Sequence, residues 1–404
     1  MLTGRGGRDA AHLLRISNFR WFVIGNALAF VAAQMRTMAQ SWLVLAETDS
    51  KFWVGLVGGA STVTTLAISP LAGVAADRLD RRSLLLASRV LQAVLVFTTA
   101  LIVSSGHVEA WHLLVLSAGA GLVLAILGPA GETVLLDVVG SHRLLSANGL
   151  NLGIAYIGRF VGPVVGGVLI ATYGVSETFH VVGVVVIATF GTTLMLHLPG
   201  PGPSRHRHPV LDLAQGLRYV VFTPHIALLM FLTSLAVFAG VYLPLVPVYA
   251  RDVLDVGSVG FGFLEAAAAL GTFLGSFGLV SIGEVRRKVR MVVLSAVVFG
   301  SGMVVFAFSR DFYLSLAALL AIGLATPFWM GGLRTVVQAT VLDEMRGRVM
   351  GVFFVALQLF GLGWLIGGAM AETVGNEATL LIGGGAFALL NVAAYWRSAT
   401  LRVL

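Results

Sequence analysis

Apolar runs of membrane-spanning length recur along the whole chain and constrain its fold more than any other feature. Eight runs contain no charged residue: 52–76, 110–131, 178–204, 225–250, 291–309, 312–333, 349–371 and 378–396. Four more contain one charge each, namely 21–45 with Arg36, 83–106 with Arg89, 144–172 with Arg159 and 257–283 with Glu265. Because about 20 apolar residues cross the hydrocarbon core of a bilayer as a helix, the sequence predicts an all-α membrane protein with twelve transmembrane helices.

The placement of charge supports this topology. Only 11% of the 404 residues are charged, whereas a soluble domain has about 25%. If both termini lie inside, twenty of the 26 Lys and Arg fall in inside segments and three in outside loops. Basic residues collect on the cytoplasmic side of membrane proteins, so we expect cytoplasmic termini. The net charge of +7 then reflects topology, with anionic lipid rather than nucleic acid as its partner.

A polar break rich in Pro and His divides the chain near its middle. It covers 199–209 and precedes a short amphipathic helix, expected over 210–223 at the cytoplasmic surface. The predicted domains are a six-helix bundle over 1–198, a linker over 199–224 and a second six-helix bundle over 225–404. Gly73 with Arg81–Arg82 recurs as Gly278 with Arg286–Arg287, and such repeated halves are a known transporter plan with the substrate site between them.

Two motifs carry a resemblance to a known family. Gly73-x-x-x-Asp77-Arg78-x-x-Arg81-Arg82 lies between the second and third spans. In the fifth span, glycines and a proline are spaced as Gly149, Gly158, Gly162, Pro163, Gly166 and Gly167, a pattern that brings helices close together.

Over nearly its full length the chain resembles the major facilitator superfamily. The resemblance implies that the first motif, with Asp137, closes the cytoplasmic gate, and that the fifth-span pattern is an antiporter motif typical of exporters. Asp80 stands where that family usually has glycine.

Further segments resemble the enterobactin-exporter and macrolide-efflux branch of this superfamily. They are 41–45, 128–132, 243–251 and 343–350, and the last adds Asp343, Arg346 and Arg348 to the expected gate. Gly131 stands where the family has an arginine linked to proton coupling.

Charged residues inside the membrane are costly and usually functional. We expect Glu132 or Glu265 to carry a coupling proton, with Asp137 as a weaker candidate. Arg36, Arg159 and Arg334 are expected to bias these acids or to hold an anionic substrate group; a static ion pair between helices is the alternative. The expected aromatic lining of the substrate cavity is Trp42, Phe238, Tyr242, Phe328, Trp329 and Phe354. Pro244 and Pro247 are expected to interrupt the seventh span.

The resulting prediction is a secondary exporter of amphipathic organic compounds, such as a drug, siderophore or metabolite, driven by proton antiport and alternating access. A lipid or lysolipid flippase, an uptake symporter and a non-transporting sensor remain as alternatives. We expect neither an enzyme nor a cofactor or metal, since there is no cysteine and no P-loop. The protein is expected to be monomeric in a bacterial inner membrane.

Overall fold

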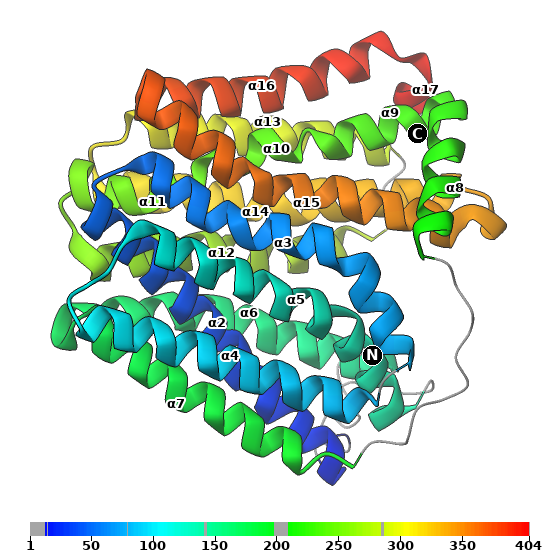
Figure 1. Cartoon of the computed structure of the whole chain (residues 1–404). Coiled ribbons are helices and arrows are strands. Elements are labelled where there is room, and N and C mark those ends of the chain that lie inside the picture. The colour runs from blue at the N-terminus through cyan, green and yellow to red at the C-terminus, as the bar shows by residue number, and fades with distance from the viewer. Residues whose placement is uncertain are drawn as a thin grey trace. The chain divides into compact units, whose positions relative to one another are not determined.

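The computed structural model describes residues 13, 15–78, 80–140, 144–197, 209–283 and 287–403. Within these ranges the side chains of 70–71, 73–78, 81, 128–133, 136–137, 145, 209–210 and 403 are not described. The described chain is almost entirely helical, with short connections between the helices, and contains no strand. Twelve of its helical segments are long and apolar enough to cross a membrane, which confirms the predicted fold class (Figure 1).

Backbone contacts divide the protein into two compact units. Unit 1 comprises 1–43 and 63–206, and unit 2 comprises 44–62 and 207–404. The hairpin 44–62, which joins the first two spans, therefore packs with the second unit although the sequence places it in the first half. The linker helix also packs with unit 2.

Unit 1 is formed by six helices, of which the first two continue into unit 2. They are α2 (Ser17–Thr48), α3 (Lys51–Arg78), α4 (Arg81–Ser104), α5 (Ala110–Val139), α6 (Leu144–Tyr173) and α7 (Val175–Leu194). Asp80 explains where α4 begins. Its φ of −61° does not require glycine, and its carboxylate accepts hydrogen bonds from the Ser83 backbone N–H at 2.9 Å and hydroxyl at 2.8 Å. This N-cap satisfies N–H groups that the first helical turn leaves open.

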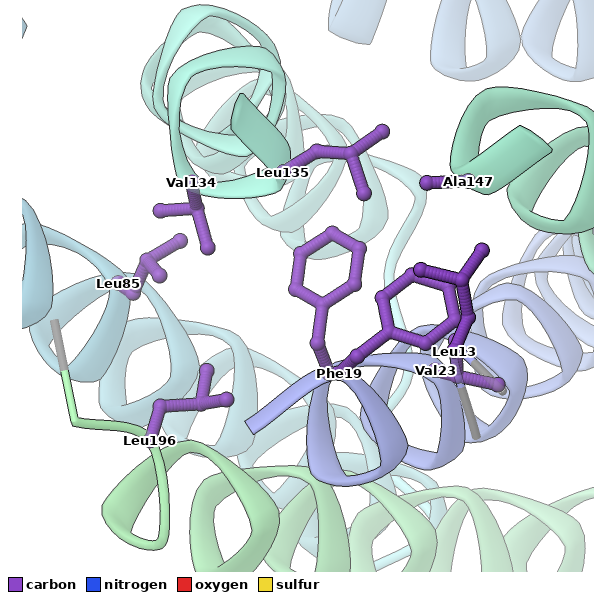
Figure 2. Packing of buried hydrophobic residues seen from close by; sticks show 9 residues of the cluster. Leu13, Phe19, Val23, Leu85, Val134, Leu135, Ala147 and Leu196 are labelled. Atoms are coloured by element: carbon purple, nitrogen blue, oxygen red, sulfur yellow. The ribbon is translucent and has the colours of Figure 1, made fainter. Parts of the chain in front are cut away.

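An apolar cluster holds one end of unit 1 together (Figure 2). Phe19 and Val23 of α2 lie there with Val134 and Leu135 of α5, and Ala147 comes from α6. These positions are at the start of α2 and α6 and at the end of α5, as an up-and-down bundle requires. Close packing of these side chains fixes α2, α5 and α6 relative to one another at this end of unit 1.

Unit 2 contains the linker helix α8 (Pro209–Phe222) and the six remaining spans. The seventh span is made of α9 (Pro224–Ser234), α10 (Ala236–Ala239), η2 (Gly240–Tyr242), α11 (Leu245–Val248) and η3 (Tyr249–Val253). The others are α12 (Gly257–Ile282), α13 (Lys288–Phe308), α14 (Phe312–Thr340), α15 (Asp343–Val374) and α16 (Asn376–Arg397), followed by α17 (Ala399–Val403).

The seventh span is broken, as its prolines predict. Pro244 and Pro247 cannot donate a backbone hydrogen bond within the helix, so the chain passes through 3₁₀ and π turns. The break begins earlier than predicted, at Leu235. At Gly240 an added Cβ would lie 1.9 Å from the Phe360 carbonyl oxygen, so only glycine permits this approach to α15.

Candidate functional site

A cavity of about 340 Å³ lies inside unit 1. Its lining comes from α2, α4, α5, α6 and α7 and from Leu196 just beyond α7. Leu135 and Leu85 belong both to the lining and to the apolar cluster of Figure 2, so the cluster borders the cavity. Most of the wall is apolar, while Arg36, Arg89, several amides and three threonines form its polar part. A largely apolar pocket with a few polar groups is the usual form of a small-molecule site.

Arg36 is the predicted site residue that the structure places in this cavity. Its Nη1 donates to Gln40 Oε1 at 2.7 Å, one turn further along α2. The Gln40 Nε2 in turn donates to the Leu113 carbonyl oxygen on α5 at 3.1 Å. Gln40 therefore fixes the position of the guanidinium, and Gln40 takes only one of the five N–H donors of Arg36.

Arg89 is a second arginine of the cavity, which sequence reasoning treated only as a topological charge. Its side chain is 7% exposed, and its Nη1 donates to Gln92 Oε1 at 3.2 Å. Its Nε is buried and has no hydrogen-bond partner in the described part of the chain. Eight residues separate Arg89 from the start of α4 at Arg81, which places it about 12 Å into the helix. An N-cap at Asp80, had it been recognised in the sequence, would have predicted this depth of Arg89 within the helix.

The antiporter-motif glycines seat α6 directly on α2. A Cβ at Gly158 would lie 2.6 Å from Phe30 Cβ, and one at Gly162 would lie 2.7 Å from Gln34 Cβ. At Gly166 the nearest side-chain atom of α2 would be 3.3 Å away. Three members of the motif therefore form one face at four-residue spacing, and this face positions the segment of α2 that leads to Arg36.

The other members of the motif lie elsewhere on α6. Pro163 and Gly167 are buried within the helix, whereas Gly149 is exposed and an added Cβ there would meet no atom within 4 Å. Asn151, about two turns before the glycine face, accepts a hydrogen bond from Asn26 Nδ2 on α2 at 2.9 Å. This bond supports the same helix pair.

The predicted basic residues outside α2 are both exposed. Arg159 lies on α6 in unit 1. Arg334 lies on α14 in unit 2, with its guanidinium carbon 5.6 Å from the ring centre of Phe354, a cation–π contact. Phe354 is itself 48% exposed, so this pair presents an amphipathic surface on unit 2.

The remaining predicted aromatics differ in burial. Trp329 is 1% exposed and stacks edge-on against Phe387 at 5.1 Å. Tyr242 is buried against Phe299 at 6.0 Å. The half-buried residues are Trp42, Phe238, Phe328 and, among the predicted acids, Glu265 on α12.

The predicted gate is described only in part. Arg82 Nη2 donates to the Leu194 carbonyl oxygen at 2.8 Å, joining α4 to the end of α7. In unit 2, Arg346 pairs with Asp343, and Arg348 Nε donates to Asp212 Oδ1 of α8 at 3.0 Å. The other predicted gate and coupling side chains lie outside the described residues: Gly73, Asp77, Arg78, Arg81, Glu132 and Asp137.

A contact that sequence reasoning missed joins the hairpin 44–62 to α15. Glu372 Oε2 accepts hydrogen bonds from the backbone N–H groups of Lys51 at 2.9 Å and Phe52 at 3.1 Å, at the start of α3. A Cβ at Gly55 would lie 2.8 Å from the Gly368 Cα, so the two backbones touch. A carboxylate at a helix N-terminus is a favourable pairing, but only tertiary structure brings Glu372 there.

Three comparisons place these features in a family. The family model described as transmembrane secretion effector matches residues 10–403. The multidrug efflux pump Tap of Mycolicibacterium fortuitum is 29% identical over 372 residues, which cover 88% of each chain. The enterobactin exporter EntS of Shigella boydii is 25% identical over 389 residues, 90% of each chain.

Solved structures agree on the fold. The nucleoside transporter NupG superposes with a TM-score of 0.75 at 14% identity, covering 94% of this chain and 98% of that one. At this identity the likeness concerns the fold alone. The twelve spans, the glycine face of α6 and the match over nearly the whole chain lead to one conclusion: the protein belongs to the transmembrane secretion effector family of major facilitator transporters.

Proposed function

We propose that the protein is a secondary active exporter of amphipathic organic compounds, driven by proton antiport and alternating access. The observation that carries this proposal is the cavity inside unit 1, whose wall is mostly apolar and also holds Arg36, Arg89 and a few uncharged polar side chains. Such a lining suits a molecule with an apolar body and a polar group. The two efflux proteins among the relatives support export as the direction.

For proton coupling we propose Glu265 first. It is half-buried on α12, within a segment long enough to cross the membrane. A carboxyl group at such a depth exchanges its proton when its surroundings change between aqueous and apolar. Glu132 and Asp137 stay as further candidates on α5.

Alternating access would use two closures. On the cytoplasmic side we propose the motif from Gly73 to Arg82 together with Asp137, Asp343, Arg346 and Arg348. On the outer side we propose the contact of the hairpin 44–62 with α15, because Glu372 must release the N-terminus of α3 before the two elements can separate. Rocking of two bundles around a fixed site is the known mode of transporters with this plan.

The test is transport by everted membrane vesicles that contain the protein and an energised proton gradient. A panel of cationic, neutral and anionic amphipathic dyes is added while the internal pH is followed with a fluorescent indicator. We expect at least one dye to be accumulated with release of internal protons. If no dye moves and none changes the pH, while the purified protein is folded, the export proposal fails and the sensor alternative gains support.

The residue-level test is Glu265→Gln, with Glu344→Gln as its control because Glu344 is exposed at the start of α15. We expect Glu265→Gln to abolish proton-driven accumulation while leaving the melting temperature of the protein near that of the wild type. Undiminished transport by Glu265→Gln would remove this residue from the coupling mechanism.

A further inference from the structure

We infer that the cavity in unit 1 binds the anionic group, a carboxylate or a phosphate, of an amphipathic compound between Arg36 and Arg89. This inference rests on the proposed export function and specifies the chemical class of its substrate. It assigns a binding role to Arg89 and a positioning role to Gln40 and Gln92, which hold the two guanidinium groups.

The two arginines of the cavity have no acidic partner among its described lining residues. Both guanidinium groups line the cavity, and no carboxylate is among its described lining residues. Their hydrogen-bond partners in the described chain are neutral amides, Gln40 for Arg36 and Gln92 for Arg89. Two cations in an apolar wall are unfavourable without a counter-charge, so an anion that enters the cavity relieves this cost.

The guanidinium groups of Arg36 and Arg89 also have N–H donors for an anion. Each guanidinium has five N–H groups arranged as a planar fork that matches a carboxylate or phosphate. Arg89 is 7% exposed, donates once to Gln92, and keeps a buried Nε without a partner in the described part of the chain. A buried donor of this kind is rare in proteins unless water or a ligand completes it.

The apolar wall selects the rest of the molecule. Leu116, Val123 and Leu127 of α5 line the same cavity, and its volume of about 340 Å³ is within the range of small-molecule pockets. A small inorganic ion would leave these side chains without contacts. The lining therefore favours an anion that carries an aromatic or aliphatic body.

An internal counter-charge is the competing explanation. Glu132 and Asp137 belong to α5, which also lines the cavity, and their side chains lie outside the described residues. If one of them neutralised Arg89, removal of the arginine would leave a buried carboxylate unpaired and destabilise the protein. If Arg89 has no internal counter-charge, Arg89→Gln would leave the melting temperature of the ligand-free protein unchanged or raise it.

The experiment measures binding by titration calorimetry at neutral pH, using the full-length protein in phosphatidylcholine nanodiscs. The probes share one aromatic body: 1-naphthoate, 1-naphthyl phosphate, 1-naphthylmethanol and 1-naphthylmethylammonium. The variants are Arg36→Gln, Arg89→Gln and the control Arg397→Gln, since Arg397 is exposed at the end of α16. Melting temperatures are measured without probe, also for Arg89→Gln combined with Glu132→Gln or Asp137→Asn.

We expect the two anionic probes to bind more tightly than the alcohol and the ammonium compound. Loss of one charged hydrogen-bond partner should weaken anion binding about 10- to 100-fold in Arg36→Gln and Arg89→Gln, and Arg397→Gln should bind as the wild type does. If added phosphatidylglycerol competes with the anionic probes, the anion that the cavity binds is a lipid headgroup. If phosphatidylglycerol does not compete, the anion is a free solute.

Three results would overturn the inference. The first is equal binding of the anionic and neutral probes, and the second is anion binding that survives both arginine substitutions. The third is a lowered melting temperature of Arg89→Gln that either double substitution restores, because Arg89 would then have an internal partner. Binding does not depend on transport, so anion binding without export would refute the proposed function alone, and export without anion preference would refute this inference alone.

Discussion

The packing of α6 on α2 gives a quantitative prediction for a single methyl group. In Gly162→Ala the added Cβ would lie 2.7 Å from Gln34 Cβ and 2.9 Å from the Val31 carbonyl oxygen. Both distances are shorter than real contacts of a Cβ atom. The Val31 carbonyl belongs to the backbone of α2, so it cannot move away without shifting the helix. The two helices must therefore move apart, and overpacking of this kind costs about 1–3 kcal/mol.

Gly149→Ala is the matched control. Gly149 lies in the same helix, and a Cβ there meets no atom within 4 Å. Both substitutions gain the same helix propensity, about 1 kcal/mol, so the difference between the two variants isolates the steric cost. For a unit of this size, 1–3 kcal/mol corresponds to a melting temperature lower by about 2–12 °C in Gly162→Ala than in Gly149→Ala.

The assay is thermal unfolding of the purified variants in one detergent, followed by dye accumulation in vesicles. We also expect weaker transport by Gly162→Ala, because the displaced segment of α2 leads directly to Arg36. Equal melting temperatures of the two variants would refute the close contact between α2 and α6 and with it the structural role assigned to the motif.

Other consequences concern caps and ion pairs at the helix ends. Hydrogen bonds from the hydroxyl and then the N–H of Ser83 lower the pKa of Asp80 from 3.8; this stabilisation is present above pH 3.8 and is lost as the pH falls through the lower folded pKa. Asp80→Ala should therefore cost about 0.5–2 kcal/mol at neutral pH, measured by thermal unfolding, whereas Asp80→Asn should keep most of the cap and lose the acid dependence; equal stability of Asp80→Ala and the wild type would contradict the cap. Glu372→Gln should speed hydrogen exchange of the first turn of α3, and unchanged exchange there would count against the outer closure. Arg348→Gln should free α8 for proteolysis, as should Asp212→Asn, and the double variant should be no worse than either single one if the two act as a pair.

Much of the fold follows from the sequence because the bilayer imposes length and polarity on each span. Runs such as 291–309 have only one stable conformation in hydrocarbon, an internally hydrogen-bonded helix. Pro244 and Pro247 likewise predict a break, since a missing donor acts locally. The break starts earlier, at Leu235, and Gly240 within it touches α15, a contact that no local pattern contains.

The candidate site was predictable only where a charge interrupts an apolar run. Arg36 and Arg89 each interrupt such a run and line the cavity, although Arg89, near the end of its run, resembles a cytoplasmic charge until the start of α4 is known. Arg159 also interrupts a run but is exposed. Aromatic residues are less informative, because Trp329 and Phe354 have similar surroundings in the sequence but are 1% and 48% exposed. Burial of a side chain in a bundle depends on helix rotation, which composition does not determine.

Alternating access itself is most directly tested by distances between spin labels at neutral and acidic pH. The chain has no cysteine, so label pairs with one exposed position in each unit can be introduced without other changes. They are Tyr173→Cys with Tyr313→Cys for the outer side, and Met195→Cys with Leu342→Cys for the cytoplasmic side. We expect each pair to show two distance populations, with one pair lengthening as the other shortens when the pH changes. A single population in both pairs that no pH and no dye alters would contradict the carrier mechanism.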